Sequence, residues 1–253
     1  MKKGKLKHYA LLGLCSAVLG LVVFATGFCM TGCDPSDLSN VEYKTFHYAE
    51  SAGANIQTVK IDYDGANVNV GFGEELTIDY PKRYNKNGDE ISKITITEEN
   101  GVLSIKETAK FVLTVFDFTE SSLTLTLPTD RVFALDITTD TGDISLPSGG
   151  NYLSLDIETD TGYVKTSGTI TATSFSVDTS TGDVRIKDVL DATMVSIDTS
   201  TGDVYALLKG TKANYQTSVE TSTGDSNITD SSEGERRLIL DTSTGDITIK
   251  FVD

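Results

Sequence analysis

Two segments, VDTSTGDV at 177–184 and IDTSTGDV at 197–204, carry nearly the same eight residues twenty positions apart. Related segments stand on both sides of them: ITTDTGDI at 137–144, IETDTGYV at 157–164, VETSTGDS at 219–226 and LDTSTGDI at 240–247. A fixed period of this size is typical of stacked repeats, in which each unit buries its apolar face against its neighbours. We call the glycines of the six segments the turn glycines. They are Gly142, Gly162, Gly182, Gly202, Gly224 and Gly245.

Apolar and polar residues alternate on both sides of each turn glycine. Most repeats carry Ile, Val, Leu or Phe seven and five positions before the glycine and two and four positions after it. Around Gly182 these residues are Phe175, Val177, Val184 and Ile186. A period of two indicates two short strands per repeat, each with one buried face. The TSTGD between them is then a turn, where Gly permits positive φ or close backbone approach and Ser, Thr and Asp bond the local backbone.

The repeat predicts an all-β fold, a parallel β-solenoid (single-stranded and β-helix-like) with coils of about 20 residues. Equivalent residues of successive coils would then stack about 4.8 Å apart. An antiparallel meander would not stack them, and residues 136–253 lack the Asn-Gly hairpin signal. If the coils stack in chain order, Gly245 lies in the last coil. We therefore expect Gly245 to tolerate substitution better than Gly182.

Four regions are expected along the chain. Residues 1–33 form a membrane anchor or lipoprotein signal, 34–55 a linker and first strand, 56–135 irregular β-coils, and 136–253 the regular solenoid repeats. Within the irregular region, Asn100-Gly101 separates two alternating runs, which is a hairpin signal. The apolar run 111–118 could cover one end of the solenoid, because an open end is an exposed sheet edge.

The N-terminal segment is basic up to Lys7 and carries no charge from Tyr9 to Cys33. An uncharged run of this length can cross the roughly 30 Å hydrocarbon layer as one helix. Lys before it and Asp34 after it place the C-terminal domain outside the cell, as in a single-pass membrane protein. The alternative is a lipoprotein anchored at Cys33, because MTGC at 30–33 resembles a lipobox. The run is longer than the apolar region of a secretory signal, which favours the uncleaved helix.

The charge balance excludes several classes of function. The chain has a formal net charge of −16, and its part after residue 33 holds 17 basic and 37 acidic residues, a net of −20. This argues against binding nucleic acid or an anionic membrane surface. All three cysteines lie in the apolar segment, and His47 is the one histidine after it. We therefore expect no catalytic residues, no cofactor and no Cys- or His-ligated metal site.

Stacking would bring acidic residues into two columns beside the turn. The first column is Thr138, Glu158, Asp178, Asp198, Glu220 and Asp241, and the second is Asp143, Tyr163, Asp183, Asp203, Asp225 and Asp246. Asp178, Asp183, Asp198 and Asp203 are the candidates for holding Ca²⁺ or facing a cationic partner. The simpler interpretation is that they are solvated turn formers. The chain also lacks the GGxGxD repeat of calcium β-rolls.

The outward positions offer two further candidate sites. Paired acids such as Asp183 and Asp203 suggest cleavage of a polysaccharide by an acid and a base, but no column of Arg or Lys completes such a site. Tyr163 and Tyr205 could stack on glycans, although scattered tyrosines are more often ordinary surface residues.

The lead-in LTLTLPTDRVFALDITTDTGDISL at 123–146 and the ending DTSTGDITIKF at 241–251 frame the repeats. Together with the repeated phrase they resemble the bacterial putative-adhesin family of β-strand-repeat domains, a family of unknown function with TSTGDV repeats. GFCMTGCDPSDLS at 27–39 is similar to the end of the membrane helix and the acidic linker of many members. The resemblance implies a cell-envelope protein linked to adhesion or to envelope stress, and it brings no catalytic residues.

The leading hypothesis is a membrane-tethered, extracytoplasmic, non-enzymatic β-solenoid that serves as an adhesin or envelope scaffold. One alternative is an envelope-stress sensor or regulator that binds cationic peptides or a membrane partner. The other is a polysaccharide-active enzyme. The partners expected are the cell membrane, through the N-terminal segment, and a protein or cationic peptide, with no nucleic acid.

Overall fold

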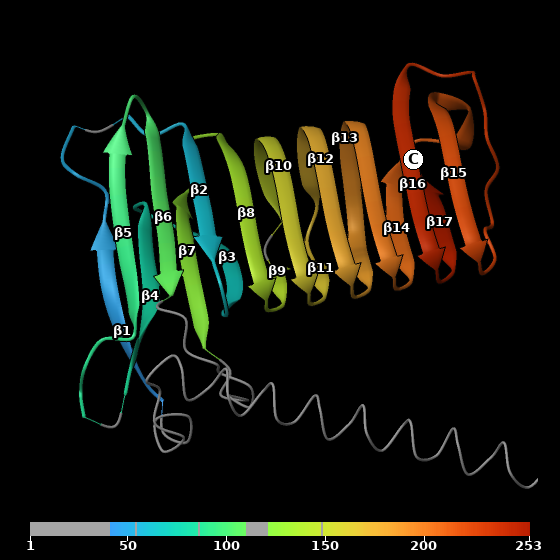
Figure 1. The fold of residues 1–253 in the computed structure, drawn as a ribbon. Coiled ribbons are helices and arrows are strands. Elements are labelled where there is room, and N and C mark those ends of the chain that lie inside the picture. The colour runs from blue at the N-terminus through green and yellow to red at the C-terminus, as the bar shows by residue number, and fades with distance from the viewer. Residues whose placement is uncertain (1–40, 54, 86, 110–120, 148) are drawn as a thin grey trace, which may run out of the picture.

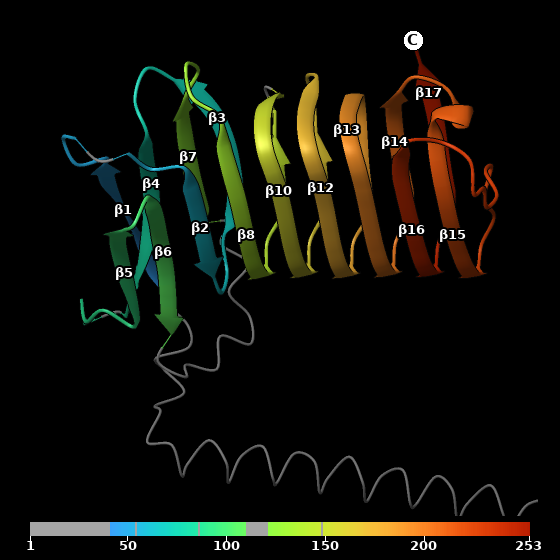
Figure 2. The same ribbon diagram turned by 90° about the horizontal axis from the view of Figure 1, so that it is seen from above.

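The computed structural model describes residues 41–53, 55–85, 87–109, 121–147 and 149–253. These residues form a stack of β-coils, seen lengthwise in Figure 1 and from above in Figure 2. The predicted all-β solenoid is confirmed. The described helical residues are a short 3₁₀ helix, Lys212–Asn214, and no described helix is long and apolar enough to span a membrane. The predicted membrane helix and Cys33 lie outside the described residues.

The strands pair in two rows that face each other across the core (Figure 1). In stack order, the long-strand sheet contains β5 (Ser92–Glu99), β6 (Val102–Ala109), β2 (Thr58–Tyr63), β8 (Phe133–Thr141), β10 (Gly150–Thr161), β12 (Ile170–Thr181), the second part of β13 (Val184–Thr201), β16 (Arg236–Thr244) and β15 (Tyr215–Thr223). The short-strand sheet contains β1 (Glu42–Ala49), β4 (Thr77–Tyr84), β7 (Ser122–Pro128), β3 (Asn67–Gly73), β9 (Ile144–Leu146), β11 (Val164–Thr166), the first part of β13, β14 (Val204–Lys209) and β17 (Ile247–Val252).

The inward positions of the coils form continuous buried columns. On the long-strand sheet one column is Val59, Leu135, Leu155, Phe175, Val195, Leu238 and Thr217, and on the short-strand sheet another is Val68, Ile144, Val164, Val184, Val204 and Ile247. Each fully buried aliphatic side chain contributes about 1.5–3 kcal/mol relative to an exposed one. The period-two pattern around the turn glycines therefore generates one core that runs the length of the stack.

The order of the coils departs from chain order at the C-terminal end. β16 lies between β13 and β15, and β17 lies beside β14 (Figure 1). The coil of Gly224 is therefore terminal and that of Gly245 is internal, so the expectation that Gly245 lies in the last coil is wrong. The apolar pattern explains this order, because the internal coil carries Leu238 and Leu240 at positions where the terminal coil carries Thr217 and Val219. Placing the more apolar coil between two others buries more apolar surface.

The N-terminal end shows the same kind of insertion. The coil of β2 and β3 lies between β6–β7 and β8–β9. Antiparallel pairs between the named strands occur at this end, as β5–β6, β1–β4 and β4–β7. The hairpin predicted at Asn100-Gly101 joins β5 to β6, with φ of 52° and 78°, both left-handed as a tight two-residue hairpin turn requires. The run 111–118, predicted to cover an end, lies outside the described residues.

A loop covers the C-terminal end of the stack. Asn227 lies beside β17, where its side-chain amide donates to the Ile249 carbonyl at 2.8 Å and its oxygen accepts the Ile249 amide at 2.9 Å. Ile228, only 6% exposed, joins the core, and Ser231 bridges to Thr217 of β15. These contacts satisfy part of an edge that would otherwise present free amides and carbonyls.

Candidate functional site

The turn glycines are required by the neighbouring coil. A Cβ at Gly182 would lie 1.8 Å from the Gly162 carbonyl oxygen, and one at Gly245 would lie 2.0 Å from the Gly202 carbonyl oxygen. Each of the other four would meet a carbonyl oxygen at 2.0–2.2 Å in the same way. Buried threonines reinforce this contact, since the Thr199 hydroxyl donates to the Gly182 carbonyl at 3.3 Å. Both expected reasons for glycine are present at these turns: close backbone approach at all six, and a positive φ of 144–159° at every turn glycine except Gly162.

The acids directly after the turn glycines form hydrogen bonds between coils. Oδ1 of Asp183 accepts the amide of Asp203 at 3.0 Å, Oδ1 of Asp203 accepts the amide of Asp246 at 2.9 Å, and Oδ1 of Asp246 accepts the amide of Asp225 at 2.8 Å. Hydrogen bonds from backbone amides to carboxylates are stronger than neutral ones. These side chains therefore bond the next coil, where we expected local backbone bonds. We call this series of hydrogen bonds the turn ladder, and both Asp183 and Asp203 belong to it.

Ionic contacts also hold Asp183. Burial alone would raise the pKa of its carboxyl, but the Asp203 amide and the Arg185 guanidinium outweigh burial and lower the pKa. Tyr163 occupies the same column one coil earlier, where its amide donates to Oδ1 of Asp143 at 2.9 Å. Its exposed ring lies 4.6 Å from Nζ of Lys165.

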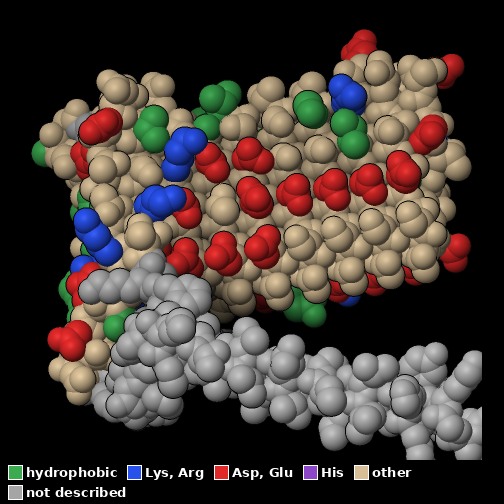
Figure 3. All heavy atoms as spheres, viewed as in Figure 1, with side chains coloured by type: hydrophobic (Ala, Val, Ile, Leu, Met, Phe, Trp, Pro, Cys, Tyr) green, Lys and Arg blue, Asp and Glu red, His purple; other side chains and the backbone are tan. Residues whose placement is uncertain are grey.

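A row of acidic side chains crosses the outer surface of the long-strand sheet. We call this row the acidic face: Glu158, Asp178, Asp198, Asp241 and Glu220, in stack order. Figure 3 shows acidic side chains following one another along this surface. The register pairs each residue with the equivalent residue of the next coil, so successive carboxylates are about 4.8 Å apart along the stack. Asp178 and Asp198 therefore belong to this row, whereas Asp183 and Asp203 belong to the turn column.

The acidic face lacks counter-ions within the described part of the chain. None of its five members takes part in an ion pair there, whereas Asp62, at the N-terminal end of the same row, pairs with Lys106, and Asp136 pairs with Lys60 at 2.6 Å. Burial raises the pKa of Asp198, and the carboxylates of Asp178 and Asp241 raise it further. The row is thus an uncompensated strip of negative charge.

The carboxylates of this surface stand in line and do not converge on a point. In residues 41–253, outside the gaps already given, no three His, Cys, Asp or Glu side chains are grouped so that they could hold a metal ion. His47, on β1, pairs instead with Asp79 of β4 at 2.7 Å.

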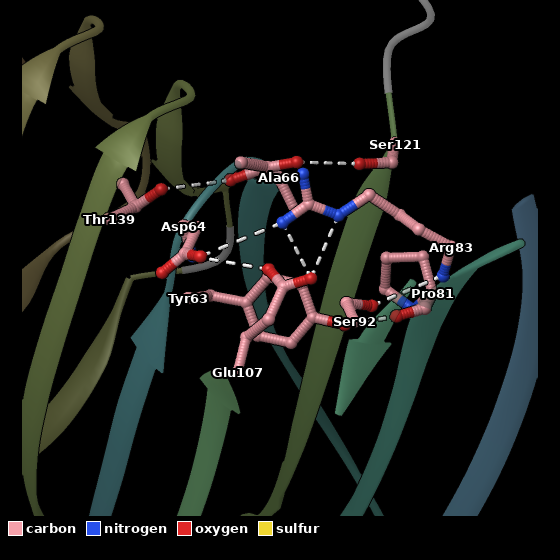
Figure 4. Close-up of polar contacts among 10 residues, drawn as sticks. Tyr63, Asp64, Ala66, Pro81, Arg83, Ser92, Glu107, Ser121 and Thr139 are labelled. Atoms are coloured by element: carbon pink, nitrogen blue, oxygen red, sulfur yellow. Dashed lines mark hydrogen bonds and ion pairs between the residues drawn. The ribbon is translucent and has the colours of Figure 1, made fainter. Parts of the chain in front are cut away.

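A buried ion pair joins the two sheets near the N-terminal end of the stack (Figure 4). Nε of Arg83 donates to Glu107 at 2.9 Å, and the Glu107 side chain is fully buried. The other Glu107 oxygen accepts the amide of Asp64 at 3.2 Å. Burial would lower the pKa of Arg83, but the Glu107 carboxylate outweighs burial and raises it. The pair joins β4, β6 and the turn after β2, so its role is structural.

Sequence reasoning missed this pair, although a signal was present. Leu103, Ile105 and Glu107 are alternate residues of β6, so Glu107 points inward like the two apolar residues before it. A carboxylate at an inward position requires a buried cationic partner. Nothing local in the sequence identifies Arg83 as that partner, because it is 24 residues away from Glu107 and lies on the other sheet.

Residues 56–253 match the Toastrack DUF4097 family. The chain belongs to that family. The resemblance to β-strand-repeat domains of the putative-adhesin kind is thereby confirmed. No curated protein matches this Toastrack chain.

Solved structures resemble this chain at low identity, and the first of them shares its fold. A Clostridium sporogenes protein described as a putative cell adhesion protein is 13% identical, with 83% of this chain and 100% of that chain covered and a TM-score of 0.53. A putative adhesin from Bacteroides fragilis is 14% identical, with 83% and 97% covered and a TM-score of 0.45. A putative lipid binding protein from Parabacteroides distasonis is 12% identical, with 85% and 98% covered and a TM-score of 0.27.

Proposed function

We propose that this Toastrack protein is a non-enzymatic, membrane-tethered, extracytoplasmic β-solenoid that acts as an adhesin or envelope scaffold through its acidic face. The observation that carries the proposal is the row Glu158, Asp178, Asp198, Asp241 and Glu220, which has no ion-pair partner among the described residues. Each coil of the row is hydrogen bonded to its neighbours, so the charges are held at a fixed spacing. A rigid anionic surface suits a cationic partner.

The non-enzymatic role is supported by what the titratable groups already do. Asp183 and Asp203 are engaged in the turn ladder, and Glu107 is buried against Arg83. The name of the Clostridium sporogenes structure, which refers to cell adhesion, agrees with a binding role. No observation favours the polysaccharide-active alternative.

The tether is proposed from the sequence of residues 9–33, which lie outside the described part. The intact mass of the protein extracted from membranes tests it. We expect the unprocessed chain. A mature N-terminus at a lipidated Cys33 would replace the helix with a lipoprotein anchor and would leave the extracytoplasmic placement intact.

The same acidic face also supports the alternative of an envelope-stress sensor. The acidic face offers a surface for cationic peptides, which are themselves agents of envelope stress. Deleting the gene separates the two roles. Loss of a transcriptional response to a cationic peptide would favour the sensor, and loss of surface attachment with an unchanged response would favour the adhesin.

Attachment of intact cells tests the adhesive proposal. Cells that express the full-length protein should bind surfaces coated with polylysine better than cells without it, and the gain should shrink when Asp178, Asp198 and Asp241 are changed to Asn. The matched control changes Glu74, Glu75 and Glu233 to Gln, which removes the same charge from exposed positions off the acidic face. Equal attachment of the two triple variants would contradict the proposal.

A further inference from the structure

A groove of about 450 Å³ lies on the short-strand sheet, on the opposite side of the stack from the acidic face. It spans β13, β14 and β17, and Arg185, Lys187, Asp203, Tyr205 and Asp246 line it. Its volume falls within the range of small-ligand sites, about 300–1,000 Å³. The groove therefore combines two cations, two carboxylates and one aromatic ring.

The residue types of the groove are not demanded by the fold. Lys165, Arg185, Tyr205 and Thr248 occupy one outward position of successive coils. Outward positions contribute little to the core, so the solenoid repeat does not determine which side chains they carry. In a chain with a net charge of −16, a basic and aromatic stretch at such positions points to a ligand.

A β-bulge presents the second cation. The register of β13 and β14 slips between Ile186 and Val189, which takes Lys187 and Asp188 out of the ladder. Asp188 fixes the bulge by accepting the Gly168 amide at 2.7 Å. Lys187 is exposed, and within the described residues it has neither an ion-pair nor a hydrogen-bond partner. Bulges commonly redirect a side chain at a functional position.

The remaining groups define the chemistry of a ligand. Arg185 bonds Asp183 through Nε and one terminal nitrogen, at 3.2 and 2.8 Å, which leaves its other terminal nitrogen to donate. Asp203 and Asp246 each use Oδ1 in the turn ladder, which leaves Oδ2 to accept hydroxyl groups. Tyr205 is half-exposed, and Nζ of Lys250 lies 5.4 Å from the centre of its ring. A sugar that packs on this ring would therefore meet a third cation at its edge.

We propose that this groove binds a short glycan with isolated carboxylate groups. The carboxylate pairs with Arg185 and Lys187, the sugar ring packs on Tyr205, and sugar hydroxyls donate to Asp203 and Asp246. A neutral glycan would leave the two cations unused, and the net negative charge of the protein would repel a dense polyanion. The proposed adhesive role supplies the biological setting of this site, but binding is measured on purified protein, so the two proposals fail separately.

The test is calorimetric titration of the full-length protein, in a mild detergent, with a tetrasaccharide of alternating glucuronate and N-acetylglucosamine. The neutral tetramer of N-acetylglucosamine serves as the comparison ligand. We expect the charged tetrasaccharide to bind more tightly. Lys187→Gln should weaken its binding about tenfold, as loss of one charge-assisted hydrogen bond does. Tyr205→Thr, which places there the residue type of Thr248 one coil later, should weaken binding of both ligands.

Lys93→Gln, an exposed change on β5 at the other end of the stack, is the matched control and should leave binding unchanged. Absence of binding by the charged tetrasaccharide would overturn the proposal. Equal affinity for the two tetrasaccharides would overturn its anionic part, as would a Lys187→Gln protein that is folded by circular dichroism and binds normally.

Discussion

The backbone amide of Asp246 donates a 2.9 Å hydrogen bond to Oδ1 of Asp203, 43 residues earlier in the chain. This bond places the coil of β16 and β17 directly on that of β13 and β14, and leaves β15 at the end of the stack. Position in the stack, and not position in the chain, therefore decides what each turn residue contacts.

Substitution of the turn glycines should follow stack position. Gly182→Ala and Gly245→Ala should each destabilise the fold by roughly 1–3 kcal/mol, because the new Cβ would meet a carbonyl oxygen of the neighbouring coil. Other coils pack on both sides of these two, so neither coil can shift to relieve the contact. Gly224→Ala should have a smaller effect, since the terminal coil can shift outward. Urea unfolding of the full-length variants, followed by circular dichroism, measures the differences.

Gly71 provides the control for this series. It lies in β3 with nothing within 4 Å of an added Cβ, so Gly71→Ala should change stability little. A Gly245→Ala protein as stable as the Gly71→Ala protein would show that the coil order is different.

The turn ladder predicts that Asp203 contributes more to stability than Asp225, which lies in the same column. Asp203→Ala should cost about 1 kcal/mol because the amide of Asp246 loses its acceptor, whereas Asp203→Asn, which keeps an oxygen, should cost less. Asp225 is last in the column, and within the described residues its carboxylate accepts no amide, so Asp225→Ala should be nearly neutral. Thermal melting compares the three proteins. Equal loss at both positions would mean that the carboxylates act only as local turn formers.

The buried pair predicts strong coupling between β4 and β6. Glu107→Leu should destabilise by about 3–5 kcal/mol, because it leaves the mostly buried Arg83 without a counter-charge. Adding Arg83→Met should recover much of this loss, since an apolar pair of similar volume removes the buried charge as well. Urea midpoints of the two single variants and the double variant measure the coupling. A double variant no more stable than Glu107→Leu would argue that packing, and not charge, is responsible.

Stability should rise when the pH falls from 7 into the mildly acidic range. The pKa of Asp198 is raised in the folded protein, so the folded state takes up its proton before the unfolded state does, and the stabilisation is lost as the pH rises through that pKa. At lower pH the trend reverses, because the pKa values of Asp183 and Asp191 are lowered and their contribution disappears on protonation. Melting temperatures across pH should therefore pass through a mildly acidic maximum.

Asp198→Asn checks the origin of that maximum. It should raise the melting temperature at pH 7 and reduce the gain on acidification, whereas Glu233→Gln in the C-terminal loop should do neither. A profile that Asp198→Asn leaves unchanged would remove the acidic face as its cause.

Much of the architecture could be predicted from the sequence because the repeat is nearly invariant. The alternation around Gly182 identifies the inward residues, and the fixed period identifies which residues stack. The order of the terminal coils could not be read, since the TSTGD phrase is the same in the coils of Gly224 and Gly245. The weaker apolar pattern at Thr217, Val219 and Ser226 is what distinguishes them.

The candidate site was predicted in part for a similar reason. Columns follow from the period, so residue spacing alone places Asp178 beside Asp198, as the structure does. The contacts of Asp183 with the next coil depend on side-chain direction, which a period does not define. The groove depends on the bulge at Lys187, and no sequence pattern marks that bulge.

The central claim is that the acidic face binds cationic partners, and one binding measurement tests it most directly. Full-length protein is titrated with a lysine-rich peptide at low, physiological and high NaCl, and the same titration is made with Asp178, Asp198 and Asp241 changed to Asn. The control again changes Glu74, Glu75 and Glu233 to Gln, which gives the same net charge.

We predict that the unmodified protein and the control bind the peptide with an affinity that falls steeply as salt rises, and that the acidic-face variant loses most of this binding. Equal weakening in the two triple variants would mean that net charge alone attracts the peptide. That result, or no binding by the unmodified protein at low salt, would contradict the claim.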